Sequence, residues 1–331
     1  MPPGQSQRPF RILSLEGGGV MGAFSASVLA ALEQSTGCRC VDHFDLITGT
    51  STGGIIAIGL GLGLSAEEIL EFYRKQGPVI FNNAGITYRL FQKIQHIFQP
   101  KHSHNTLRQA LKAAFGDLKF GESKCRLLIP TYDAIGGRIF LMKTAHHERF
   151  EYDIDALAVD VALATSAAPT YFSAAPFPLH EGSSYVDGGV WANCPALAGL
   201  VEAVHFLNVP PDQIDILNIG TTGSPFSVSQ NTQAGLFGWA KSLINLFMNS
   251  QAEASRATSY LLTKGGFFNI NYVTTPGRFS LDDSSKVSEL INLGRGEAVK
   301  RDNLETVQRR FLNGNKVKPF VPLHQVRQKT Q

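Results

Sequence analysis

One serine in the chain has the sequence context of a nucleophile. The segment Gly49-Thr50-Ser51-Thr52-Gly53 follows residues 44–48, which are typical of a buried strand, and precedes a glycine-rich apolar stretch typical of a helix. A Gly-x-Ser-x-Gly turn in this context lifts the serine hydroxyl out of a tight bend, and its two glycines let the backbone pass closely. The pattern predicts that Ser51 is a nucleophile, although a glycine-rich turn with a structural serine would look the same.

A second glycine-rich turn precedes it. Residues 16–22 read Glu-Gly-Gly-Gly-Val-Met-Gly and lie between a strand-like and a helix-like segment. Gly17, Gly18 and Gly19 can expose backbone N–H groups that stabilise a developing oxyanion. A nucleotide-phosphate loop is the rival interpretation. It is disfavoured because no Gly-Lys-Ser/Thr is present and no acidic residue is placed for a ribose.

A carboxylate follows a third strand-like segment. Asp187-Gly188-Gly189 comes directly after residues 183–186. An aspartate at a strand end can lie at the same sheet edge as Ser51 and accept its proton, whereas in isolation a turn-forming aspartate is the commoner case.

These residues need a parallel sheet to bring them together. Strand, helix, strand and helix patterns alternate over residues 11–15, 21–34, 44–48 and from 52 onward, which predicts an α/β fold with a mainly parallel central sheet. Ser65 and Glu68 read as a capping box for a helix ending near residue 76. Later strands are expected at residues 126–132, 138–143, 184–186 and 214–219, and helices at residues 159–164 and 196–206.

The order of these elements suggests three parts. Residues 1–9 are polar and proline-rich and form a flexible N-terminal segment, residues 10–222 form the catalytic core, and residues 223–331 form a mainly helical C-terminal part packed on the same domain, apart from a strand-like stretch at 266–272. Residues 85–104 interrupt the strand-helix alternation and are predicted to be a lid or a surface insertion.

The composition narrows the class of protein. Of 331 residues, 43% are apolar and 17% charged, which suits a globular chain with a sizeable core. The net charge is +3 without blocks of like charge, so no nucleic-acid polymer is expected as a partner. The four cysteines do not have zinc-site or disulfide-framework spacing, no export signal is visible, and the longest apolar run, residues 55–64, is too short to cross a bilayer. We therefore expect a cytoplasmic protein with at most peripheral membrane contact.

The three motifs, in this order, resemble the patatin-like phospholipase family, and residues 164–172 are also typical of it. The resemblance covers roughly residues 11–220. It implies a three-layer α/β/α fold and a Ser-Asp dyad that hydrolyses acyl esters of phospholipids without a metal or other cofactor. By this resemblance the site comprises the catalytic Ser51 and Asp187, the oxyanion donors Gly17, Gly18 and Gly19, the elbow glycines Gly49 and Gly53, and the glycines after the aspartate, Gly188 and Gly189.

Two residues depart from the family pattern. Glu16 stands where aspartate is common, and Met21 stands where arginine or lysine is common. Met21 removes a cation near the oxyanion loop and is the one feature that favours a catalytically weak or dead lipid-binding protein of the same fold. Because the backbone donors remain, we expect activity to persist.

A Ser-His-Asp esterase is the competing enzyme class, with His205 or His324 following Asp187. The topology disfavours it, since only one strand and one helix precede the strand that leads to Ser51. Without a histidine, a carboxylate with a pKa near ~3.9 is a weak base, so we expect the site of Asp187 to be partly desolvated.

The substrate must reach the site from a membrane. Apolar residues at near-helical spacing predict a helix that is either membrane-facing or lid-like, or, as we favour, core-facing or a dimer contact: Phe237, Trp239, Leu243, Ile244, Phe247 and Met248. The chain also resembles bacterial patatin-like effectors that cyclic nucleotides activate in anti-phage defence, which implies such an activator. Head-group preference, the position of cleavage and a homo-oligomeric state are left open.

Overall fold

The central sheet consists of eight strands. The computed structural model describes residues 8–81, 104–223, 236–314 and 316–327, and within the helix that begins at residue 236 it describes side chains from residue 246. The strands are β1 Phe10–Leu15, β2 Leu46–Gly49, β3 Arg126–Asp133, β4 Arg138–Lys143, β5 Ala175–Pro176, β6 Ser184–Asp187, β7 Ile214–Ile219 and β8 Phe267–Ile270.

The sheet is parallel in the middle and antiparallel at one side. Its order is β5-β6-β3-β2-β1-β7-β8, with β4 also paired to β3. Strands β3, β2, β1, β7 and β8 are parallel to their neighbours in this series, whereas β4 and β6 run antiparallel to β3 and β5 runs antiparallel to β6. The predicted mainly parallel core is thus extended by an antiparallel edge.

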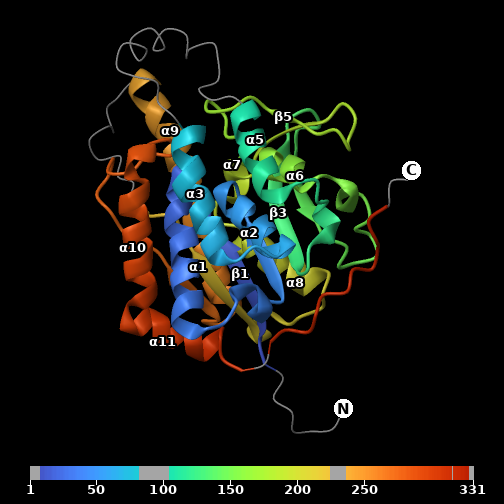
Figure 1. Ribbon diagram of the computed structural model, residues 1–331, viewed down its shortest axis with the longest axis vertical. Coiled ribbons are helices and arrows are strands. Elements are labelled where there is room, and N and C mark those ends of the chain that lie inside the picture. The colour runs from blue at the N-terminus through green and yellow to red at the C-terminus, as the bar shows by residue number, and fades with distance from the viewer. Residues whose placement is uncertain (1–7, 82–103, 224–235, 315, 328–331) are drawn as a thin grey trace.

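Helices cover both faces of the sheet, as Figure 1 shows. Helices α1, α2, α3 and α10 pack in one large apolar cluster on one face, and α8 and α9 pack on the other. The predicted three-layer α/β/α fold is confirmed. The α-helices are α1 Gly22–Thr36, α2 Thr52–Leu62, α3 Ala66–Ile80, α5 His104–Phe115, α6 Ala158–Ser166, α7 Gly189–Ala192, α8 Ala196–His205, α9 Leu236–Leu262, α10 Val287–Val299 and α11 Arg301–Arg310.

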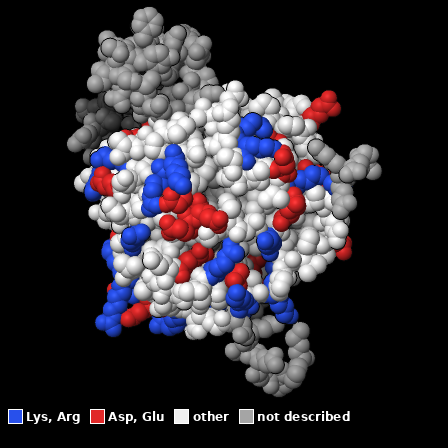
Figure 2. Space-filling model, in the orientation of Figure 1, with Lys and Arg blue, Asp and Glu red and all other residues white. Residues whose placement is uncertain are grey.

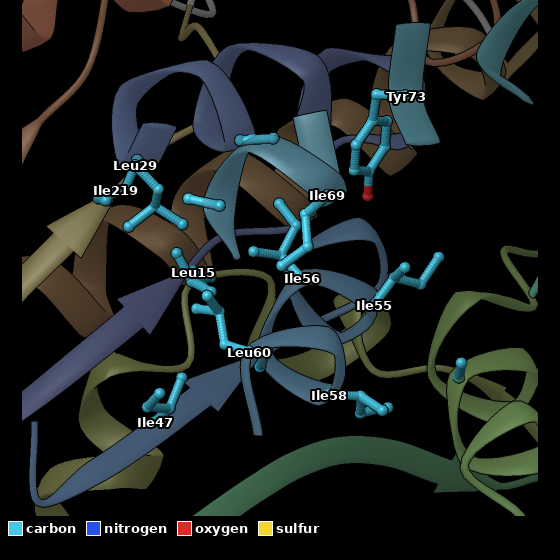
Figure 3. Close-up of a cluster of buried hydrophobic side chains, with 14 of the residues drawn as sticks. Leu15, Leu29, Ile47, Ile55, Ile56, Ile58, Leu60, Ile69, Tyr73 and Ile219 are labelled. Atoms are coloured by element: carbon cyan, nitrogen blue, oxygen red, sulfur yellow. The ribbon is translucent and has the colours of Figure 1, made fainter. Parts of the chain in front are cut away.

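Helix α2 is buried along its length, with Leu62 only partly exposed at its end. Figure 3 shows Ile56 near Ile69 of α3, and Leu60 near Leu15 of β1. A methyl group on Gly59 would lie 3.1 Å from Ile69, so glycines let the neighbouring helix approach closely. Because α2 begins directly after Ser51, this packing fixes the turn at Ser51 against the core.

Most predicted element positions agree with the structure within two residues. The capping box of Ser65 and Glu68 is present, with both reciprocal hydrogen bonds. Helix α3 continues beyond the predicted end near residue 76, because Phe81 N–H still donates to the Gly77 carbonyl around Pro78. The proposed lid at residues 85–104 lies outside the described residues except for His104, which begins α5.

The C-terminal part is in close contact with the core. Helix α10 packs along α1, and β8 adds a parallel strand beside β7. The boundary at residue 222 between the core and the C-terminal part remains a proposal. Strand β8 lies after this boundary and still pairs with the core sheet.

Charges of both signs are interspersed on the face shown in Figure 2. In the described part of the chain, no helix has the length and apolar character needed to cross a membrane.

Candidate active site

One edge of β3 brings the two predicted catalytic residues together. Strand β2 pairs with the first residues of β3 in parallel, and β6 pairs with its last residues in antiparallel orientation, while β4 occupies the opposite edge. The carboxyl ends of β2 and β6 therefore face each other across Ile129 and Pro130. Ser51 follows the first of these ends, and Asp187 is the last residue of the second.

Ser51 occupies a strained turn. Its φ of 56° and ψ of −124° are unusual for a residue with a side chain, as expected of a nucleophile elbow. A methyl group on Gly49 would lie 2.2 Å from the Gly53 carbonyl oxygen, and one on Gly53 would lie 2.2 Å from that of Leu15. Both elbow glycines are thus required by close backbone packing.

Asp187 is buried and hydrogen-bonded. Its side chain accepts the Gly189 N–H at 2.6 Å, and it lines the same cavity as Ser51, whose side chain interacts with it. Burial raises the pKa of Asp187 from 3.8 to about 6, although the interactions with Ser51 and the Gly189 N–H lower it. The expected desolvation is therefore present, and it makes the carboxylate a stronger base. Gly188 packs so tightly on β3 that a methyl group there would lie 2.3 Å from the Pro130 carbonyl oxygen.

Residues 165–167 hold the two partners in place. Thr165 Oγ1 accepts the Ser51 N–H at 3.1 Å and donates to the Pro130 carbonyl at 2.7 Å. The carbonyls of Thr165 and Ala167 accept the N–H groups of Gly188 and Asp187, respectively. The segment at residues 164–172, singled out for its resemblance to the family, thus contacts both predicted catalytic residues.

The glycine loop borders Ser51, but its three N–H groups differ. Gly17 N–H donates to the Asn193 carbonyl at 3.0 Å, so it is not free for an oxyanion. Within the described ranges, the N–H groups of Gly18 and Gly19 donate to no protein acceptor, and both residues line the same cavity as Ser51. Gly19 has a φ of +57°, and a methyl group on Gly18 would lie 2.3 Å from Thr221 Oγ1.

Asn193 is a site residue that the sequence analysis missed. Its main chain binds the glycine loop, and its side-chain Oδ1 is buried without a hydrogen-bond partner among the described residues. A methyl group on Gly17 would lie 2.5 Å from this oxygen, and one on Gly189 would lie 3.3 Å from it. The carboxamide therefore lies between the glycine loop and the aspartate loop. A polar residue six positions after Asp187 was the available signal.

A cation also lies near the glycine loop. Glu16 accepts hydrogen bonds from Arg256 of α9 and from Asn218 of β7, each at 2.7 Å. Met21 Sδ instead accepts a hydrogen bond from the Thr222 hydroxyl. Position 21 therefore carries no cation, as predicted, but Arg256 of α9 places one beside Glu16. Sequence reasoning missed Arg256 because positions 21 and 256 are far apart in the chain.

A cavity of about 900 Å³ opens beside Ser51 and Asp187. This volume lies in the upper part of the range of ~300–1,000 Å³ for small-molecule sites. Its walls are mainly apolar and include Ile55, Phe72 and Leu107, together with Phe247 and Met248 of α9. Phe247 is 62% exposed, so this end of the predicted apolar stripe borders the cavity rather than the core. The side chains of Phe237, Trp239, Leu243 and Ile244 lie outside the described residues.

No histidine lies among the described residues that line this cavity. His205 is exposed at the end of α8, and His324 Nε2 contacts the Glu148 carbonyl. In the described ranges, no cluster of three or more histidine, cysteine or acidic side chains could hold a metal ion.

Known proteins are similar to this chain in sequence. Two bacterial relatives are named cGAMP-activated phospholipase: one from Vibrio cholerae is 38% identical over 245 residues (69% of this chain and 69% of the relative), and one from Pseudomonas aeruginosa is 33% identical over 305 residues (91% and 88%). Patatin-like protein 2 of Arabidopsis thaliana is 31% identical over 265 residues (69% and 64%). The family model for patatin-like phospholipase matches residues 13–200. Since this match spans more than half of the chain and includes both sheet ends that carry Ser51 and Asp187, the chain belongs to the patatin-like phospholipase family.

Proposed function

We propose that the protein hydrolyses fatty-acyl esters of membrane phospholipids with Ser51 as nucleophile and Asp187 as base. The juxtaposition of a strained Ser51 and a buried Asp187 in one large, mainly apolar cavity is the observation that carries this proposal. An acyl chain would occupy the apolar cavity, and its ester carbonyl would lie against the glycine loop.

The geometry supports a two-step reaction. Ser51 Oγ attacks the ester carbonyl carbon while Asp187 takes its proton, and the N–H groups of Gly18 and Gly19 stabilise the oxyanion. Asp187 then gives the proton to the departing alcohol oxygen, which leaves an acyl-Ser51 ester. In the second step Asp187 takes a proton from water, the hydroxide attacks the acyl carbon, and the fatty acid is released as the proton returns to Ser51.

A cyclic nucleotide activates the enzyme in this proposal, as part of defence against phage. The support is that the two bacterial relatives above are named cGAMP-activated phospholipases and that one of them aligns with 91% of this chain. We further propose that the protein is cytoplasmic and contacts the membrane peripherally when active. A homo-oligomer fits the proposal equally well.

The test is release of labelled fatty acid from phospholipid vesicles, with and without cGAMP. Ser51→Ala and Asp187→Asn should each lose at least about 100-fold in rate, because each removes a group that acts in the transition state. His205→Ala is the matched control and should retain wild-type activity, whereas a loss would favour a Ser-His-Asp esterase. If all the folded proteins, wild type included, bind lipid but release no fatty acid in either condition, the protein is a lipid-binding member of the fold.

A further inference from the structure

A second cavity, of about 270 Å³, lies at the opposite end of the sheet from Ser51. It is lined by Asp45, which precedes β2, by Arg126, the first residue of β3, and by Gly63, which caps the C-terminal end of α2. Since β2 and β3 are parallel, these residues lie at the amino ends of the strands, whereas Ser51 follows the carboxyl end of β2. The C-terminal segment around residues 316–320 forms one side of this cavity. A hydrogen bond from the Val317 N–H to the Asp42 carbonyl holds the segment in place. Figure 1 shows this segment in red passing beneath the sheet.

This cavity, which we call the basic pocket, has more positive charge than its own carboxylates neutralise. Its five cationic side chains are those of Arg39, Lys124, Arg126, Lys316 and Lys318. Its two carboxylates are already engaged, because Asp42 pairs with Lys316 and Asp45 pairs with Arg8.

Four cations of the basic pocket therefore have no carboxylate within salt-bridge distance in the described ranges. Arg126 is the clearest case: its Nε is buried without a hydrogen-bond partner, and burial lowers the pKa of its guanidinium. Its Nη1 donates to the Asp45 carbonyl, whereas the Asp45 carboxylate pairs with Arg8 and acts on Arg126 only beyond salt-bridge distance. A bound anion would give this partly buried guanidinium a direct counter-charge.

One accessible aromatic ring completes the basic pocket. Phe320 is partly exposed and lies 5.4 Å from the guanidinium of Arg126, measured to the ring centre, whereas Phe44 is fully buried against Phe311. Cationic side chains bind phosphate oxygens through charge-assisted hydrogen bonds, and aromatic or guanidinium planes stack on nucleobases. A ligand that carries both a phosphate and a base fits this combination better than inorganic phosphate alone.

We propose that the basic pocket binds the cyclic-nucleotide activator through a phosphate and one base. This inference rests on the proposed activation and adds where the activator binds. The volume is below the usual range of ~300–1,000 Å³ for a whole ligand, so one nucleotide unit of a cyclic dinucleotide occupies the basic pocket and the other extends beyond it. A membrane head group fits less well, since a bilayer that reaches Ser51 at one end of the sheet does not also reach the other end.

Helix α2 connects the basic pocket to the nucleophile. Arg39 donates hydrogen bonds to the Gly63 and Leu64 carbonyls at its C-terminal end, and Leu60 lines the pocket. The opposite end of the same helix begins at Ser51, about 16 Å away by the rise of ~1.5 Å per residue. A phosphate that draws Arg39 or Lys124 from this helix end would act on a buried, rigid element that carries the Ser51 turn.

The experiment compares two double variants by titration calorimetry with cGAMP. Lys124→Gln with Lys318→Gln removes two exposed charges from the basic pocket, and Lys75→Gln with Arg301→Gln removes two exposed charges elsewhere. The pocket variant should bind cGAMP at least about tenfold more weakly, with a shallower salt dependence, whereas the control should match wild type. The pocket variant should also need at least about tenfold more cGAMP for half-maximal fatty-acid release, with an unchanged melting temperature.

The possible failures are distinguishable. Equal cGAMP binding by the pocket variant and wild type would overturn the proposed site while leaving activation intact. No cGAMP binding by wild type would overturn both the activator and its site, but not hydrolysis, which the Ser51→Ala comparison tests independently. Loss of binding to anionic phosphatidylglycerol vesicles with unchanged cGAMP binding would assign the basic pocket to a lipid head group and overturn the proposal.

Discussion

At the scale of single residues, the environment of Asp187 determines how readily its carboxylate accepts a proton. An aspartate in water is too acidic to take a proton from serine efficiently, and burial corrects this by raising its pKa to about 6. The Gly189 N–H and the Ser51 side chain both favour the ionised form of the carboxyl group and limit the rise of its pKa, so the group is still ionised at neutral pH. In the proposed mechanism, a base of this strength acts on Ser51 directly, without a histidine between them.

The pH dependence of activity should report this pKa. Because Asp187 acts as a base only when ionised, kcat/KM should be constant above pH 7 and fall about tenfold per pH unit below about 6. Initial rates with a soluble fluorogenic ester between pH 4.5 and 8.5 measure it. A profile that is flat through pH 6 while the protein stays folded would argue against Asp187 as the base.

The same pKa predicts a stability cost at neutral pH. The pKa of Asp187 is higher in the folded protein than its ordinary value of 3.8, so the folded state binds this proton more tightly. Its contribution to stability is therefore greatest below pH 4 and falls as the pH rises to about 6. Asp187→Asn removes the buried charge and keeps an oxygen for Gly189. It should raise the free energy of unfolding at pH 7 by on the order of 1–3 kcal/mol, with little change at pH 4. Urea unfolding at both pH values tests this, and a variant less stable than wild type at pH 7 would contradict it.

At the scale of elements, the meeting of β2 and β6 along one edge of β3 creates the site. Thr165 at the end of α6 lies where neither strand pairs with β3, and its hydroxyl joins the Ser51 N–H to the Pro130 carbonyl. The hydroxyl thus replaces part of the missing strand pairing and keeps the nucleophile turn at a fixed distance from the sheet.

Replacement of this hydroxyl should reduce both activity and stability. Thr165→Val keeps the side-chain shape but leaves the Ser51 N–H and the Pro130 carbonyl unpaired in a buried site, at a cost of about 1–3 kcal/mol for each. A small displacement of Ser51 should lower kcat about 10- to 100-fold. The matched control is Thr36→Val at the end of α1, where the lost hydroxyl bonds only locally to Leu32 and Cys38. Fatty-acid release and urea unfolding of both variants test this prediction. Equal kcat values for Thr165→Val and Thr36→Val would show that Thr165 does not position Ser51.

At the scale of the whole molecule, the sequence predicted those parts of the site that depend only on neighbouring residues. The nucleophile turn, the glycine loop and the aspartate turn each lie within a few residues of a strand end, so their element context could be read directly. The roles of Asn193 and Arg256 could not, because the partners of these residues lie elsewhere in the chain. The sequence also could not show that the Gly17 N–H is engaged within the protein. Its acceptor is the Asn193 carbonyl, which only the folded chain brings to the glycine loop.

The ion pair of Glu16 and Arg256 joins α9 to the glycine loop, two segments that are far apart in the sequence. Arg256→Gln leaves the Glu16 carboxylate buried with only Asn218 as a close hydrogen-bond partner, and should destabilise the protein by about 3–5 kcal/mol. Adding Glu16→Gln should recover much of this loss, since no uncompensated buried charge remains. Thermal and urea unfolding of the two single variants and the double variant measure the coupling. Additive losses would show that the two charges do not stabilise each other.

The proposal that Ser51 attacks the ester with Asp187 as its base is tested most directly by trapping the nucleophile. The protein would be incubated with a fluorophosphonate, with and without cGAMP, and the modified peptide identified by mass spectrometry. We predict one adduct, on the peptide that contains Ser51, formed at least about 100-fold more slowly in Asp187→Asn. An adduct on another residue, or equal labelling rates in wild type and Asp187→Asn, would contradict the proposed dyad.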